Sequence, residues 1–326
     1  AQDLKFNENK LVSSRNFANK IRNAARFVMM NLDDYTPGAP DPTTPADRWI
    51  FSRLARLVAS IDEAYKEYEF SDMTRELYAF FWNEFCDWYI ELAKYRIYHA
   101  EEDPKGANDA LWTLREVLKD SLKLLHPYMP FVTEEIYGKL IPEEESLMMS
   151  AWPEYDEALN FPEAERIVDH YKEIVRGIRN VRAEMNVPNS RKATAYVVCE
   201  DQTLCDGLAF MTNSAKQMAS VLDLVIQKDK AGIADDAVSV VVPDATVYVP
   251  LEELIDFDQE IERLTKEETR LNKEIARAQG MLNNEKFVSK APEAKVQEER
   301  EKLETYKQMK AQVSERLEGL KAKQSK

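Results

Sequence analysis

Apolar residues recur every three or four positions through residues 8–140, and this spacing predicts amphipathic helices with one buried face each. A Pro-rich stretch at 37–45 interrupts the pattern and predicts a break after the first helix. The expected helices cover residues 8–32, 47–68, 71–95, 105–125 and 131–140. Because such helices bury their apolar stripes against one another, we expect a helical bundle.

The pattern changes after residues 141–160, a Pro-containing acidic stretch that we interpret as a linker. A long helix is expected over 163–185. Beyond it the apolar residues alternate with a period of two and are rich in β-branched types, which predicts strands. The expected elements are strands at 193–199, 222–227, 237–242 and 246–249, with a helix at 205–220. This part is predicted to form a small α/β domain.

From Leu254 onward, apolar or small residues alternate at spacings of three and four, the heptad pattern of a coiled coil. Glu268 breaks this seam in the first run, and Glu299 and Lys310 break it in the second. The segment 283–292 between the runs ends in a proline and cannot continue one straight helix. We therefore predict an antiparallel hairpin with arms of about 40 Å each.

These patterns together predict a mainly α protein in three parts. The expected domains are a helical bundle over 1–155, a long helix plus a small α/β connecting domain over 156–253, and an antiparallel coiled-coil hairpin over 254–326. The chain has only 8 glycines among its 326 residues, which agrees with a largely helical structure.

The formal net charge of −15 on its own argues against nucleic acid as a partner. The charge is unevenly distributed, however. Residues 1–30 carry six basic and two acidic side chains, and residues 172–192 carry the same numbers. Because charges act locally over a Debye length of about 10 Å, two basic patches can attract RNA in an acidic protein.

Three cysteines without close pairing give neither a disulfide framework nor a zinc site, and we interpret them as reduced thiols of a cytosolic protein. No apolar run approaches the roughly 18 residues of a membrane helix, and no signal peptide is recognisable. The chain begins at Ala1, in the approach to a helix, so we expect it to be a piece of a longer protein.

The first helix carries the residues with the clearest chemistry. Its stripe expected to be buried is Phe17, Ile21, Ala24 and Val28. Two neighbouring stripes are Asn16, Lys20, Asn23 and Phe27, and then Arg15, Asn19, Arg22 and Arg26. Guanidinium groups hold phosphates, amides read base edges and a ring stacks on an unpaired base, so this face suits a single-stranded RNA loop. The alternative is a solvated helix face whose Phe27 packs against a neighbouring helix.

Several segments resemble the valyl branch of the class I aminoacyl-tRNA synthetases. "SSRNFANKIRNAARFVMMNL" (Ser13–Leu32) is similar to the segment that follows the KMSKS region in that family, and "NEFCDWYIELAK" (Asn83–Lys94) resembles a second signature. "LLHPYMPFVTEEIY" (Leu124–Tyr137) and "IRNVRAEMNVP" (Ile178–Pro188) recur more widely among related synthetases. "NEKFVSKAPEAKVQEEREKL" (Asn284–Leu303) resembles the turn of the family's C-terminal coiled coil.

The resemblance implies an anticodon-binding domain over residues 1 to about 155 and a hairpin that leans on the tRNA corner where the D and T loops meet. It places Lys20, Arg26 and Phe27 at the anticodon, together with Asn16, Asn19 and Asn23, and the cationic stripe adds Arg15 and Arg22. On the tRNA body it places Arg270, Lys273 and Arg277 of the hairpin. We also expect Arg179 and Arg182 of the second basic patch there, and Lys286 at the hairpin turn. Arg22 departs from the pattern, because many relatives have an aromatic residue there.

The resemblance also implies a parent enzyme that attaches valine to the 3′ end of tRNA(Val) with ATP and Mg. Neither a HIGH-type nor a KMSKS-type motif occurs in this chain, so we expect no catalytic residue, no metal site and no cofactor within it, and no activity of the chain alone. The expected partners are tRNA(Val) and the catalytic and editing domains of the full-length protein. We expect a cytoplasmic monomer without membrane contact.

Two alternatives remain open from the sequence. The heptads also suit a protein-interaction scaffold whose coiled coil recruits a partner helix. Alternatively, the chain is the equivalent part of another class I synthetase, such as the isoleucyl enzyme. That enzyme's C-terminal region usually has cysteine-rich zinc binding, which Cys199 and Cys205 do not reproduce.

Overall fold

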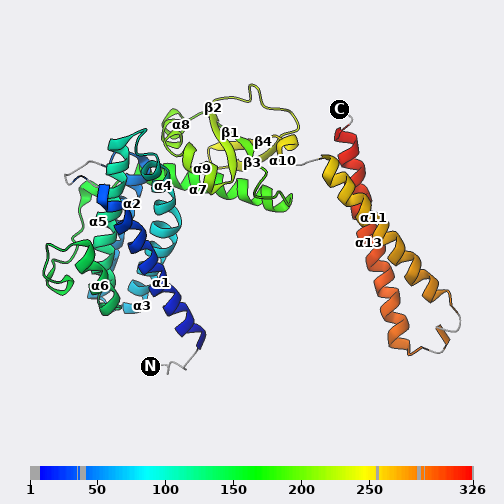
Figure 1. The fold of residues 1–326 in the computed structure, drawn as a ribbon, viewed down its shortest axis with the longest axis horizontal. Coiled ribbons are helices and arrows are strands. Elements are labelled where there is room, and N and C mark those ends of the chain that lie inside the picture. The colour runs from blue at the N-terminus through cyan, green and yellow to red at the C-terminus, as the bar shows by residue number, and fades with distance from the viewer. Residues whose placement is uncertain are drawn as a thin grey trace. The chain divides into compact units, whose positions relative to one another are not determined.

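The computed structural model describes residues 8–34, 36, 42–254, 257–284, 288–289 and 291–324 (Figure 1). The chain divides into two compact units. The first comprises Ala1–Ala183 with Lys192–Val249, and the second comprises Glu184–Arg191 with Pro250–Lys326. No described helix is both long and apolar enough to pass through a lipid bilayer.

The first unit begins with a helical bundle. Its elements are α1 (Glu8–Asn31), α2 (Pro45–Lys66), α3 (Phe70–Tyr78), a π-helical segment (Ala79–Tyr89), α4 (Ile90–Tyr98), α5 (Pro104–Leu125) and α6 (Pro130–Leu140). Short 3-10 turns lie at Leu32–Asp34, Leu147–Met149 and Glu157–Leu159. Thr44 and Asp103 cap α2 and α5 with their side-chain oxygens, and each helix starts with a proline, whose missing N–H would be unpaired there anyway.

The third predicted helix differs from its expectation of a regular 3.6-residue period. Residues 79–89 form i→i+5 hydrogen bonds, so α3 and α4 are separate helices joined by a π-helical segment. The segment reads AFFWNEFCDWY and contains six aromatic side chains. A wider turn gives these rings more room, and Phe81, Phe85 and Tyr89 are all buried in the core.

A buried ion pair joins α2 to α4 in the middle of the bundle. The Nη1 atom of Arg96 lies 2.8 Å from both carboxylate oxygens of Asp47, and the Tyr89 hydroxyl donates to the same carboxylate at 2.6 Å. Asp47 is fully buried. Burial lowers the pKa of Arg96, but Asp47, Tyr89 and Asp109 together outweigh this effect and the net pKa is raised, so the guanidinium stays charged.

The α/β part of the first unit follows helix α7 (Pro162–Glu184). Its strands are β1 (Ala193–Cys199), β2 (Val221–Gln227), β3 (Val238–Val242) and β4 (Ala245–Val249), in the sheet order β2-β1-β4-β3. β1 and β2 are parallel, and α8 (Gln202–Ala209) and α9 (Thr212–Met218) form the crossover that parallel strands require. The Ser214 hydroxyl donates to the Leu92 carbonyl at 3.1 Å and ties α9 to α4.

Gly207 permits close packing between α8 and α7. A Cβ atom at this position would lie 2.6–3.0 Å from three side-chain atoms of the buried Ile167. Gly207→Ala is therefore expected to cost about 1–3 kcal/mol of unfolding free energy through overpacking, measured by urea denaturation. Gly138→Ala in α6 is the matched control, because a Cβ there meets nothing within 4 Å and should stabilise by about 0.5–1 kcal/mol. A stabilised Gly207→Ala variant would contradict this packing.

The second unit contains α10 (Leu251–Leu254) and the long helices α11 (Phe257–Leu282) and α13 (Glu293–Gln324). Leu264 packs with Leu317 and Leu320. Glu260 pairs with Arg316 at 3.3 Å, and Glu268 accepts a hydrogen bond from the Ser314 hydroxyl at 2.6 Å. Residue numbers of the contacting pairs increase along α11 while they decrease along α13, so the two helices are antiparallel.

The fold class expected from the sequence is confirmed: the protein is mainly α, with a small α/β part and a C-terminal helical hairpin. Two of the polar residues in the heptad seam have partners in the hairpin. Glu268 accepts a hydrogen bond from the Ser314 hydroxyl, and one carboxylate oxygen of Glu299 lies 3.5 Å from the Lys302 ammonium, while its Oε2 atom is buried without a hydrogen-bond partner among the described residues. The heptad positions of α11 and α13 pack against each other within the chain. The scaffold alternative, in which they pack against a partner helix, is therefore not favoured.

Candidate nucleic-acid interface

Helix α1 packs one face on α5, α6 and the π-helical segment and leaves the other at the surface. The stripe expected to be buried is buried, with Ile21 and Val28 at 0% exposure. Of the two outer stripes, Asn16, Asn19 and Asn23 are exposed, and so are Arg15, Arg22 and Arg26. Lys20 and Phe27 are only partly exposed.

Lys20 is held by the π-helical segment. Its ammonium donates to the Asp87 carboxylate at 2.7 Å and lies 5.0 Å from the centre of the Trp82 ring. The pair is accessible to water, with 30% of the Lys20 side chain and 46% of the Asp87 side chain exposed. An incoming phosphate or base can therefore reach this ammonium only in competition with a carboxylate of the same protein.

Phe27 sits at the edge of the bundle against α4. Its ring centroid lies 6.5 Å from that of Tyr98 in an edge-on arrangement, and the Lys94 ammonium lies 5.6 Å from its centre. Phe27 therefore packs in part against the neighbouring helix α4, as the alternative expected. Because Phe27 is partly exposed and Tyr98 is 58% exposed, the two rings also form a surface with a cation beside it.

The cations of α1 differ in their surroundings. Arg22 pairs with Glu135 of α6 at 3.2 Å, while Arg15 and Arg26 make no ion pair with any described residue. The structure therefore brings Arg15 and Arg26 to the surface with their charge unneutralised. The exposed amides of Asn16, Asn19 and Asn23 lie on the same outer side of the helix.

Sequence reasoning missed the residues that α3, the π-helical segment and α4 bring beside α1. Tyr78 stacks on Trp82 with ring centroids 5.4 Å apart, and both contact Phe17 of α1. Lys94 and Tyr98 flank Phe27. The aromatic-rich stretch 78–98 indicated that many rings lie in this region. A regular 3.6-residue period does not show which of these rings face α1.

The second basic patch, on α7, is largely occupied within the protein. Lys172 is buried with its ammonium 4.2 Å from the centre of the Trp49 ring, and burial lowers its pKa. Arg176 lies beside Trp88 and pairs with Glu173. The exposed Arg179 donates to the Met218 carbonyl at 2.5 Å. Arg182 is 5% exposed, and burial lowers its pKa, so the structure does not place it at the surface expected for it.

The hairpin places Arg270, Lys273 and Arg277 together on the exposed outer side of α11. Arg270 pairs with Glu267 and Arg277 with Glu274, each one turn earlier in the helix. Together with Arg263 and Lys266, these residues form a column of five cations at spacings of three and four. Lys286 lies outside the described residues.

The two helices of the hairpin differ in how their outer charges are arranged. On α11 the five cations follow one another in a single column, whereas the outer side of α13 mixes the exposed acids Glu298, Glu301, Glu304, Glu315 and Glu318 with the exposed bases Lys295, Arg300, Lys307 and Arg316. The column on α11 is therefore the stretch of the hairpin that best suits a line of phosphates.

Among the described residues, no cluster of three or more His, Cys, Asp or Glu side chains could hold a metal ion. Cys86, Cys199 and Cys205 are free and buried, and burial raises the pKa of Cys86 to about 12, so it is not a nucleophile at neutral pH.

Comparison with known proteins gives the class of two regions of the chain. Residues 47–197, from α2 to β1, match the family described as the anticodon-binding domain of tRNA ligase. Residues 256–321 match the family described as the valyl tRNA synthetase tRNA binding arm. The domain match begins after α1, so the surface on that helix lies just outside the matched range.

Curated relatives agree over nearly the whole chain. The chain is 43% identical to the valine–tRNA ligase of Clostridium perfringens over 324 residues and 42% identical to that of Listeria innocua over 329 residues. Each match covers 98% of this chain and 36% of the relative. The chain belongs to the valyl-tRNA synthetase family and spans little more than a third of the length of these relatives.

Proposed function

We propose that this chain is the tRNA-recognition part of a valine–tRNA ligase, which holds tRNA(Val) by its anticodon loop and its elbow. The observation that carries the proposal is the presence of an anticodon-binding match and a tRNA-binding-arm match in one chain that aligns throughout with valine–tRNA ligases. The parts that lie beyond this chain would attach valine to the 3′ end using ATP and Mg. We assign the whole protein to the cytoplasm as a monomer.

In this proposal the outer side of α1 binds the anticodon loop. Arg15 and Arg26 are exposed and suit phosphates, with Arg22 able to exchange Glu135 for one. Asn16, Asn19 and Asn23 can donate to and accept from base edges. The Phe27 and Tyr98 rings offer an unpaired base a stacking surface, with Lys94 close by, and Lys20 lies further along the helix beside Trp82.

The remaining contacts are proposed along the tRNA body. The α11 column of cations suits the phosphates of the elbow, and Arg179 is exposed on α7. We omit Arg182 because its side chain is buried. The proposed domain boundaries are those expected from the sequence: 1–155 for anticodon binding, 156–253 for the connecting part and 254–326 for the tRNA-binding arm.

A binding comparison tests the whole proposal. Filter binding of the chain to tRNA(Val) and to an unrelated elongator tRNA should give tighter binding to tRNA(Val) at moderate salt. Exchanging the anticodon of tRNA(Val) should remove most of the preference. Equal affinity for all three RNAs would exclude anticodon recognition by this chain.

Removing the cations of the α11 column tests the elbow contact. The triple variant Arg270→Ala, Lys273→Ala, Arg277→Ala should bind tRNA(Val) more weakly. The negative slope of log K against log salt should become shallower by about 2–3. The matched control, Lys295→Ala, Arg300→Ala, Lys307→Ala, removes the same charge from exposed positions of α13. An equal loss in both variants would indicate a general charge effect and no defined face.

A further inference from the structure

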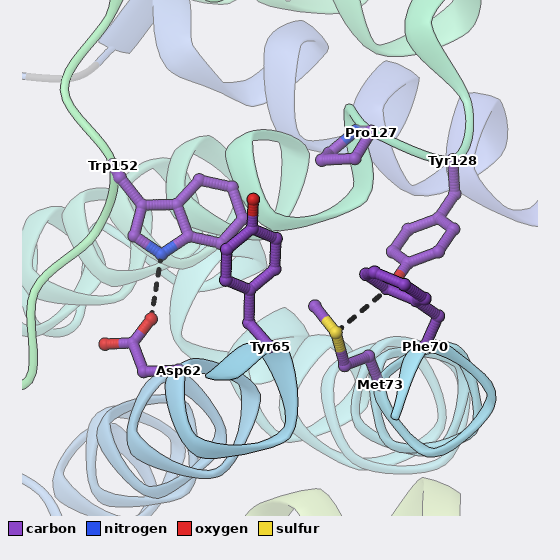
Figure 2. Close-up of a pocket in the computed structure, with 7 residues that line it drawn as sticks. All are labelled: Asp62, Tyr65, Phe70, Met73, Pro127, Tyr128 and Trp152. Atoms are coloured by element: carbon purple, nitrogen blue, oxygen red, sulfur yellow. Dashed lines mark hydrogen bonds between the residues drawn. The ribbon is translucent and has the colours of Figure 1, made fainter. Parts of the chain in front are cut away.

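A cavity of about 560 Å³ lies in the helical bundle, within the size range of ligand sites. Figure 2 shows its seven lining residues: Asp62, Tyr65, Phe70, Met73, Pro127, Tyr128 and Trp152. They come from the end of α2, the start of α3, the turn after α5 and the segment before α7. Met73 is buried, and its sulfur accepts a hydrogen bond from the Tyr128 hydroxyl at 3.5 Å, which links α3 to the turn after α5 on this side of the cavity.

Aromatic rings form the walls and remain open to solvent. Tyr65, Phe70 and Trp152 are 63%, 47% and 41% exposed, although each is large and apolar. Tyr65 and Phe70 meet edge-on with centroids 6.2 Å apart. The Trp152 indole donates to the Asp62 carboxylate at 3.1 Å, which holds this ring against α2 and places a negative charge at the cavity (Figure 2).

The segments that form the walls are strongly acidic. Residues 62–76 contain six acids and two bases. Both bases are already paired, Lys66 with Glu63 and Arg75 with Asp72. The segment that carries Trp152, residues 150–157, contains three acids and no base. Acids therefore outnumber bases along these two walls, which favours a cationic ligand over a phosphate-bearing one such as RNA.

We propose that this cavity is a docking site for a basic segment of a partner polypeptide, with an Arg or Lys side chain between the rings of Tyr65, Phe70 and Trp152. The faces of aromatic rings attract cations, and Arg stacks on them while its alkyl stem covers apolar surface. Asp62 and the unpaired acids of 62–76 neutralise the charge of the segment. The cavity holds more than one side chain, so an apolar neighbour of the basic residue packs over Met73.

This proposal is independent of tRNA recognition, because the surfaces proposed for tRNA are basic and this one is acidic. It assigns the anticodon-binding bundle two sites of opposite charge. An anionic RNA and a cationic polypeptide segment can then be bound at the same time.

Two blocked peptides test the proposal, Gly-Arg-Leu-Arg-Gly and its counterpart Gly-Glu-Leu-Glu-Gly. The readout is the indole N–H resonance of Trp152 in the whole chain, identified by its absence in Trp152→Phe. The Arg peptide should shift this resonance saturably below about 10 mM, and the Glu peptide should not. Phe70→Ala and Asp62→Asn should each weaken the Arg peptide about fivefold. Leu222→Ala, a similarly exposed apolar residue on β2, is the control and should leave the affinity unchanged.

Several outcomes would overturn the proposal. They are the absence of a saturable shift with the Arg peptide, equal shifts with both peptides, and unchanged affinity in Phe70→Ala. A shift caused by tRNA(Val) and by neither peptide would instead make the cavity part of the RNA surface.

Discussion

Arg96→Met is expected to lower the free energy of unfolding of the first unit by about 3–5 kcal/mol. Met replaces the alkyl stem of Arg with an unbranched apolar chain of similar length, but it lacks the guanidinium that neutralises the fully buried Asp47. An unpaired carboxylate in the core is costly because neither water nor another charge compensates it. Urea denaturation followed by circular dichroism measures the loss.

The surface ion pair between Arg75 and Asp72 is the matched control. It has the same charges at 2.8 Å, but 71% of the Arg75 side chain is exposed. Arg75→Met should therefore change the unfolding free energy by about 0.5 kcal/mol or less. The double variant Arg96→Met, Asp47→Leu should recover much of the lost stability, because it removes the uncompensated charge as well. A similar small loss in Arg96→Met and Arg75→Met would contradict a role of the buried pair in stability.

Phe27→Ala is expected to weaken binding of tRNA(Val) by about 1–3 kcal/mol, which is roughly 5- to 150-fold. The reason is loss of the ring surface that Phe27 forms with Tyr98 beside Lys94. Filter binding with tRNA(Val) measures the effect. The loss should be much smaller with a tRNA whose anticodon loop has been exchanged.

Because Phe27 is partly buried, packing must be separated from stacking. Phe27→Leu keeps most of the apolar contact with α4 but has no π face, so it should be almost as weak in binding as Phe27→Ala while folding normally. Phe210→Ala removes a ring that is 64% exposed at the end of α8, away from α1, and should leave tRNA binding unchanged. Full binding by Phe27→Leu would show that the ring contributes packing alone.

The sequence predicted those features of the fold that depend on a sustained local period. The expected strand 193–199 is β1 residue for residue, and the expected strands around 222–249 begin or end within one residue of β2, β3 and β4. The hairpin was predictable because two heptad runs separated by a break that contains a proline can fold back and pair with each other. In each case the residues that define the element lie within a few positions of one another.

What the sequence could not predict depends on contacts between distant residues. Lys20 and Asp87 are 67 positions apart, and no local pattern indicates that the carboxylate would hold the ammonium. Lys172 appeared in a basic patch, yet its side chain is buried against Trp49, which lies on another helix. The π-helical hydrogen bonding of 79–89 was likewise not indicated by the regular 3.6-residue period expected for this stretch.

The pairing of Lys20 with Asp87 changes what tRNA binding at α1 can yield. A phosphate that binds the Lys20 ammonium must displace the Asp87 carboxylate, which is left without its partner. The net number of counterions released at this point is therefore small. Binding there is an exchange of one anion for another, and its strength depends on how well the incoming group fits. Lys20 would thus favour a loop of the right shape over any polyanion, while Arg15 and Arg26 would attract both.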